Sequence, residues 1–188
     1  SSISGQVRYA DNNNLVLFVK VKIVRYDVVT REIIVVDSAV INNGIYLLPR
    51  VPKSDGLMRV ISVPDDELDG GSQDTFFVPT FFPSTIQWLN AGMVDPGSNL
   101  NNIDIQVIRR GTPVMNNSKS AVVQGNVFLN IAPPMDMLVG PFPFLKGSIV
   151  YLKKDTSFVK TTVTGENQQF TLGNIEPGTY TISVQRLG

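Results

Sequence analysis

The chain repeats one series of short motifs, and this internal repeat limits its fold more than any other feature of the sequence. Each copy opens with Gly-x-Val, continues with an apolar motif that carries an aromatic residue, and closes with a strand-like run. The first copy contains Gly5-Gln6-Val7, Gly44-Ile45-Tyr46-Leu47 and Arg59-Val60-Ile61-Ser62-Val63. The second contains Gly125-Asn126-Val127, Gln169-Phe170-Thr171-Leu172 and Thr179-Tyr180-Thr181-Ile182-Ser183-Val184. A repeat of this length predicts two copies of one folding unit.

The residue pattern within each copy is that of β-strands. Runs rich in valine, isoleucine and aromatic residues occupy residues 4–9, 15–26, 32–41, 46–48 and 57–63. Apolar and polar residues alternate over 103–107 and 179–184, which is typical of a half-buried strand with one face in water. Many short strands separated by turn residues predict an all-β chain built of β-sandwiches.

Two short segments predict tight turns. Asn43-Gly44 lies between two strand-like runs, and this dipeptide tolerates the positive φ angles that a β-hairpin requires. Glu176-Pro177-Gly178-Thr179 has a proline that presets the first corner of a turn. We therefore expect a hairpin at the first of these segments and a turn at the second.

The repeat predicts two domains in tandem. The first sandwich takes residues 1–111, a linker rich in small and polar residues takes 112–120, and a shorter sandwich of the same type takes 121–188. The first unit contains an insert-like region, residues 64–100, that the second lacks, and the proline-rich residues 132–143 predict a long loop in the second. The linker is short, so we expect limited freedom between the two units.

The composition excludes several classes of function. The chain has no histidine and no cysteine, which removes the commonest general base, the usual zinc ligands and any thiol nucleophile. Lysine plus arginine and aspartate plus glutamate each number 16, so no excess of positive charge favours binding to nucleic acid. No apolar run is long enough for a spanning helix, so we expect no membrane insertion. We interpret the chain as non-catalytic.

An acidic loop is the one candidate metal site. Oxygen donors occur at alternate positions in Asp65, Glu67 and Asp69, a glycine follows, and Asp74 stands near the place of a closing ligand. This spacing begins like a calcium loop, but Phe76 occupies the position where such a loop has its bidentate glutamate. The sequence therefore leaves two interpretations, a calcium site and a solvated acidic loop, and favours the loop without any cofactor.

An aromatic cluster is the candidate ligand-binding site. Phe81, Phe82 and Trp88 lie close together in the sequence, after Phe76 and Phe77. Such rings stack on sugars when they are exposed, and bury large apolar areas when they are not. The sequence favours burial, with the rings covering the open end of the first sandwich, and keeps glycan binding as the alternative.

The order of the motifs resembles that of the carboxypeptidase regulatory-like family, whose domains are transthyretin (prealbumin)-like, Ig-like Greek-key sandwiches. The resemblance rests on Gly-x-Val, on Gly-x-Tyr/Phe-x-Leu and on Pro-Gly-x-Tyr-x-Ile-x-Val, and it is closer in residues 125–184. In the first unit the Pro-Gly step is stretched over residues 52–56. Residues 78–85, Trp88, Ala91 and residues 102–105 resemble an extended variant found in secreted, multi-domain bacterial surface proteins.

This resemblance implies a fold and an extracellular or cell-surface setting in bacteria, and it implies no activity. We therefore expect a structural or adhesive module that serves as a spacer, a stalk or a scaffold for protein interactions. Its partners would be other domains of the same polypeptide or neighbouring surface proteins. The alternative is a carbohydrate-binding module attached to a polysaccharide-degrading enzyme.

Overall fold

The structure is a computed structural model that describes residues 1–29, 32–53, 56–64, 77–110, 121–128, 147–165 and 167–185. Within these ranges the chain is all-β, apart from one short 3-10 helix, so the predicted fold class is confirmed at this level. The predicted linker 112–120 and the predicted loop 132–143 lie outside the described residues. We call residues 1–110 the N-terminal half and residues 121–185 the C-terminal half.

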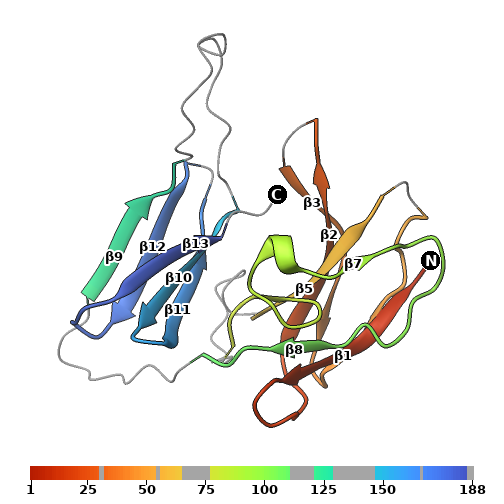
Figure 1. Ribbon diagram of the computed structural model, residues 1–188, viewed down its shortest axis with the longest axis horizontal. Coiled ribbons are helices and arrows are strands. Elements are labelled where there is room, and N and C mark those ends of the chain that lie inside the picture. The colour runs from red at the N-terminus through yellow and green to blue at the C-terminus, as the bar shows by residue number, and fades with distance from the viewer. Residues whose placement is uncertain are drawn as a thin grey trace.

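The N-terminal half contains β1 (Ile3–Tyr9), β2 (Val19–Asp27), β3 (Glu32–Ile41), β4 (Ile45–Leu48), β5 (Met58–Pro64), β6 (Thr80–Phe81), η1 (Trp88–Asn90), β7 (Met93–Val94) and β8 (Ile105–Val107). The C-terminal half contains β9 (Ala121–Asn126), β10 (Ile149–Lys154), β11 (Ser157–Val163), β12 (Gln169–Ile175) and β13 (Thr181–Gln185). Figure 1 shows the two halves side by side.

Both halves pair their strands in the same way. In the N-terminal half β1 pairs with β4, while β2 lies between β3 and β5. In the C-terminal half β9 pairs with β12, while β10 lies between β11 and β13. Each of these described pairs joins strands from one half only. The motif repeat in the sequence is therefore matched by a repeat in strand order.

The repeat extends to individual positions in the sheets. Gly5 lies opposite Tyr46 in the pair β1–β4, and Gly125 lies opposite Phe170 in the pair β9–β12. The register between β2 and β3 shifts after Ile23, and the register between β10 and β11 shifts at the corresponding place, after Leu152. These matches give a one-to-one equivalence between the strands of the two halves.

The predicted hairpin at Asn43-Gly44 is wrong, although Gly44 does adopt a positive φ of 72°. The segment joins β3 to β4, and these strands belong to different sheets, because β3 pairs with β2 and β4 pairs with β1. Tyr46 and Leu48 of β4 are buried in the same cluster as Ile3 of β1. The chain therefore crosses from one sheet to the other here, because that crossing buries the apolar side of β4.

The second predicted turn is also a crossing between sheets. Residues 176–180 join β12, which pairs with β9, to β13, which pairs with β10. The strand predicted over residues 15–26 begins later than expected, at Val19, because Phe18 has a positive φ of 56°. Leu15 makes only an isolated bridge to Arg8.

Three buried clusters hold the described residues together. The N-terminal core lies between the two sheets of its half and includes Ile3, Val7, Val21, Ile23, Tyr46, Leu48, Val60, Ile105 and Val107. The C-terminal core consists of Val127, Val150, Leu152, Phe170, Leu172 and Ile175. A third cluster, here called the shared cluster, consists of Val24, Ile61, Val63, Val78, Phe81, Trp88, Ala91, Ile149 and Tyr151. The sequence did not predict this third cluster, which takes residues from both halves.

The second edge of β1 is closed by the segment that leads into β8. The Ser4 amide donates to Leu100 O at 2.9 Å and the Ile103 amide donates to Ser4 O at 3.1 Å, and β8 continues the contact in parallel. Gly5 permits this approach, since a Cβ at that position would stand 2.3 Å from Ile103 O. The buried Tyr46 hydroxyl donates to the same carbonyl at 2.5 Å.

We predict that Tyr46 makes the protein sensitive to alkali. Burial, with a smaller contribution from the charge of Asp104, raises the pKa of Tyr46 above its ordinary value. The folded state thus favours the neutral phenol over the phenolate. The contribution of this preference to the free energy of unfolding is complete below about pH 10 and is lost as the pH rises further. Tyr46→Phe should cost about 1 kcal/mol at neutral pH, through the lost hydrogen bond to Ile103 O, and should flatten the alkaline fall in unfolding free energy.

Urea unfolding followed by circular dichroism at several pH values from neutral to alkaline measures both effects. Tyr180→Phe is the matched control, because the Tyr180 hydroxyl also donates to a carbonyl, Glu176 O, but in an exposed setting. The control should keep the alkaline fall of the parent chain. An unchanged fall in Tyr46→Phe would contradict the assignment.

Candidate functional site

The predicted aromatic residues Phe81 and Trp88 lie in the interior. Phe81 ends β6 and is fully buried, and Trp88 opens η1 and is 4% exposed. Their rings meet edge to face, with centroids 5.7 Å apart, a favourable geometry for an aromatic pair. Phe82, the third residue predicted for ligand binding, is half-buried. The packing interpretation of these rings therefore agrees with the geometry better than an exposed sugar-binding platform does.

The place where these rings pack differs from the prediction. We expected them to cover the open end of the first sandwich, but Phe81 and Trp88 belong to the shared cluster with Ile149 and Tyr151 of β10. The Tyr151 hydroxyl donates to Pro79 O at 3.4 Å, which adds a polar contact between the halves. The rings lie here because β10 brings apolar side chains against them from the other half.

The strand β10 is buried on both faces. Val150 and Leu152 point into the C-terminal core, whereas Ile149 and Tyr151 point into the shared cluster. When both strands are counted back from the register shifts after Ile23 and Leu152, Ile149 and Tyr151 of β10 correspond to Lys20 and Lys22 of β2. The outer face of β2 is therefore polar at these two positions and reaches the shared cluster through Val24, whereas β10 contributes both Ile149 and Tyr151.

Arg59 covers one face of Trp88. Its guanidinium carbon lies 4.1 Å from the centre of the ring, and its Nε donates to Trp88 O at 3.0 Å. Partial burial lowers the pKa of Arg59. The two contacts fix η1 against β5 and leave this face of the indole unavailable to a sugar ring.

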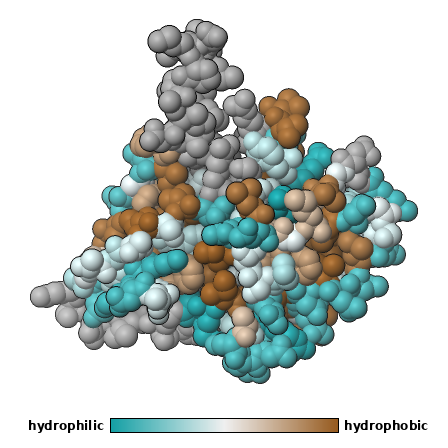
Figure 2. All heavy atoms as spheres, viewed as in Figure 1, coloured by the Kyte–Doolittle hydropathy of each residue, from teal (hydrophilic) through white to brown (hydrophobic). Residues whose placement is uncertain are grey.

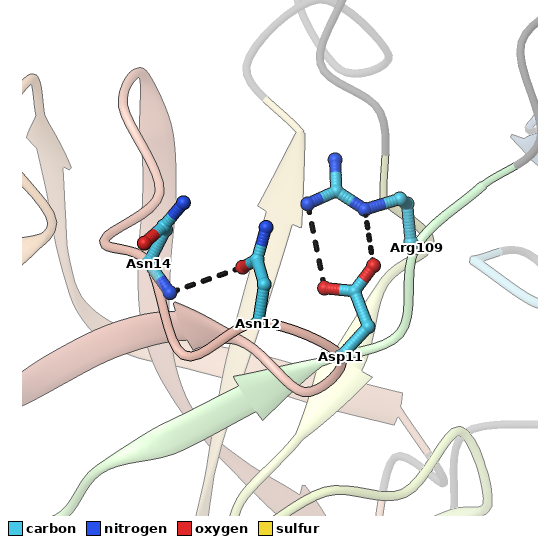
Figure 3. Close-up of polar contacts among 4 residues, drawn as sticks. All are labelled: Asp11, Asn12, Asn14 and Arg109. Atoms are coloured by element: carbon cyan, nitrogen blue, oxygen red, sulfur yellow. Dashed lines mark hydrogen bonds and ion pairs between the residues drawn. The ribbon is translucent and has the colours of Figure 1, made fainter.

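A second polar site lies where the loop after β1 meets the end of the N-terminal half (Figure 3). The Asp11 carboxylate accepts hydrogen bonds from Arg109 Nε at 2.7 Å and from Arg109 Nη2 at 3.4 Å. The Arg109 guanidinium lies 3.8 Å from the centre of the Tyr9 ring. Within the loop, the Asn14 amide donates to Asn12 Oδ1 at 3.0 Å, and Asn13 adopts a positive φ of 60°. We call Tyr9, Asp11 and Arg109 the corner site.

The corner site could not be predicted from the sequence. A run of Asp and Asn over residues 11–14 signals a turn, but nothing in the sequence relates it to an arginine far along the chain. Val78 N donates to Ile108 O, and Phe77 forms an isolated bridge with Arg109, so residues 108–109 are anchored to the interior as well. The corner site therefore ties the loop after β1 to the last described residues before the junction.

The protonation states at the corner site favour a structural ion pair over acid–base catalysis. The hydrogen bond from Arg109 lowers the pKa of Asp11, and burial raises the pKa of Tyr9. The pKa of each group is thus shifted away from pH 7. At physiological pH the Asp11 carboxyl is therefore ionised and the Tyr9 phenol is neutral. The side chains of Arg109 and Asp11 are 38% and 51% exposed, respectively, so solvent screens their ion pair.

The four residues predicted for calcium, Asp65, Glu67, Asp69 and Asp74, lie outside the described residues. Within the described part of the chain, no three acidic side chains come together as metal ligands would. In the same part, no helix is long and apolar enough to cross a membrane. No known protein family, curated protein or solved structure matches the chain.

Proposed function

We propose that this chain is a non-catalytic, structural or adhesive module of a bacterial secreted or cell-surface protein. It acts as a spacer, a stalk or a scaffold for protein interactions, and consists of two transthyretin-like Greek-key sandwiches in tandem. The shared cluster is the observation that carries the proposal. A spacer must hold its two ends in a fixed relation, and a buried apolar contact between its parts does this.

The repeated strand order supports the tandem arrangement. Each half has a strand pair facing a sheet built on a central strand, and each has a core of its own. Two units of one plan, joined by the shared cluster, extend the molecule in one direction. The partners in this proposal are further domains of the same polypeptide or neighbouring surface proteins.

The glycan-binding alternative has weaker support. A sugar-stacking site needs accessible ring faces, and Phe81 and Trp88 are buried while Arg59 covers the indole. Titration of the chain with soluble polysaccharides should leave the fluorescence of Trp88, its single tryptophan, unchanged. A saturable change would restore this alternative.

A charge placed in the shared cluster tests the spacer function. Ile149 is 2% exposed and points away from the C-terminal core, so Ile149→Asp should disrupt the contact between the halves while each core remains. We expect the parent chain to unfold in one calorimetric transition and the variant to unfold in two. Small-angle X-ray scattering should show a larger radius of gyration for the variant.

The matched control is Leu89→Asp, which places the same charge next to Trp88 on a side chain that is 84% exposed. This control should retain one transition and the parent radius of gyration. A parent chain that already unfolds in two transitions, or a variant as compact as the parent, would overturn the rigid-spacer proposal.

A further inference from the structure

The strand β9 has one edge that no described strand covers. Its other edge pairs with β12 from Ala121 to Asn126, and Figure 1 places β9 at the outer margin of the C-terminal half. Its sequence, Ala-Val-Val-Gln-Gly-Asn, contains no proline and no lysine or other charged residue. Edge strands in proteins usually carry such residues to prevent further pairing. This edge is therefore chemically open to another strand.

The N-terminal half shows what occupies the equivalent edge. The free edge of β9 corresponds to the edge of β1 that receives Leu100 and β8, where Val7 lies beside Ile105 and Tyr9 lies beside Val107. The incoming segment runs parallel to β1, with apolar side chains at alternate positions. Ile105 and Val107 are fully buried and belong to the same core as Val60 of β5.

The matching positions of β5 and β13 differ sharply in exposure. Val60 pairs with Ile23 and Ser62 pairs with Val21, and in the other half Ile182 pairs with Leu152 and Val184 pairs with Val150. Val60 and Ser62 are fully buried, whereas Ile182 and Val184 are 44% and 45% exposed. All four share a face with core residues, so no described strand gives the core face of β13 the cover that β8 gives to β5.

The surface view agrees with this comparison. Figure 2 shows apolar atoms on the left of the molecule, where Figure 1 places β9, β12 and β13. The apolar residues exposed on β9 and β13 are Val122, Ile182 and Val184. An open backbone edge and an uncovered apolar face thus occur in the same half.

We propose that the free edge of β9 is an acceptor site for an extended strand of a partner polypeptide. The strand runs parallel to β9, receives hydrogen bonds from the amides of Gln124 and Asn126, and covers Ile182 and Val184 with alternate apolar side chains. These amides are equivalent to those of Ser4 and Gln6, which donate to Leu100 O and to Asp104 Oδ1. The occupant has the chemistry of residues 103–107, with apolar and polar residues in alternation.

A second copy of the chain is a weaker candidate for the occupant. Its segment of this pattern, β8, is already paired with β1 and buried in its own half. Supplying it to a neighbour would open the N-terminal core. A strand from another polypeptide carries no such cost.

A synthetic peptide of residues 99–109, added to the full chain, tests the proposal. We expect one peptide to bind per chain by isothermal titration calorimetry. Hydrogen exchange followed by NMR should show fast exchange of the Gln124 and Asn126 amides in the free chain and slow exchange in the complex. The control peptide, which carries Ile105→Asp and Val107→Asp, should not bind.

Matched variants of the chain locate the site. Val184→Asp should weaken binding of the peptide by about tenfold or more, because it places a charge where apolar cover is expected. Val40→Asp alters a residue of β3 that is 59% exposed, and should leave binding unchanged. Since both positions are exposed, both variants should fold.

Three results would overturn the proposal. Failure of the peptide to bind would show that the edge of β9 does not accept a strand of this chemistry. Slow exchange of the Gln124 and Asn126 amides in the free chain would show that the chain fills this edge itself. A dimer in light scattering, with these amides protected in the dimer, would assign the edge to a second copy.

The inference deepens the proposed scaffold function and rests on it for its biological use. The two tests are separable, because the peptide experiment reports on the edge of β9 and Ile149→Asp reports on the shared cluster. Loss of one result leaves the other intact.

Discussion

Replacing Gly5 by alanine should destabilise the protein by about 3 kcal/mol, near the upper end of the usual cost of overpacking. The new Cβ would lie 2.3 Å from Ile103 O and 2.6 Å from Ile103 C. Both are backbone atoms, so no flexible side chain can move aside. The segment that closes the edge of β1 would have to shift, which also removes the partner of the buried Tyr46 hydroxyl.

Urea unfolding measures this loss, and hydrogen exchange at the Ser4 amide reports whether the segment has left the edge. Gly173→Ala is the control, since a Cβ at Gly173, also in a strand, meets no atom within 4 Å. Its unfolding free energy should stay within about 0.5 kcal/mol of the parent value. Equal stability of the two variants would contradict the close packing at Gly5.

Replacing Trp88 by alanine should cost about 3–5 kcal/mol, the range for removing a large buried aromatic side chain. The substitution removes the edge-to-face contact with Phe81 and the ring beneath Arg59. Because Trp88 belongs to the shared cluster, we expect the effect to reach both halves rather than the first alone.

Thermal unfolding followed by circular dichroism is the appropriate measurement, since the variant has no tryptophan left to report by fluorescence. Leu89→Ala changes the next residue of η1, which is 84% exposed, and should leave the melting temperature close to that of the parent. A folded Trp88→Ala protein with unchanged melting would show that the ring does not contribute to packing.

The candidate sites were predictable only in part. The aromatic residues were identified from their density in the sequence, and the preference for burial agrees with the structure. The corner site was not predicted, because Asp11 and Arg109 are far apart in the chain and meet only through the path of β8. The contact of Trp88 with a cluster from the other half was missed for the same reason.

The assignment of side chains to faces also required the structure. The motif repeat aligns Ile61 with Ile182, but the strand pairs make Val60 the equivalent of Ile182. The two alignments differ by one residue, which exchanges the faces of a strand. Nearly all of β5 is buried, so no alternation of polar residues marks its core face in the sequence.

The sequence by itself determined that the chain is all-β, that it contains one series of strand motifs twice, and that Gly-x-Val opens each copy. These features depend on local preferences and on side-chain pattern, which a sequence states directly. The tertiary structure alone decided that β4 pairs with β1 rather than with β3, that Ile149 and Tyr151 face the other half, and that no described strand covers the second edge of β9. Each of those outcomes depends on burial between segments distant in sequence, and an apolar run such as Ile149-Val150-Tyr151-Leu152 has no pattern that says which face meets which partner.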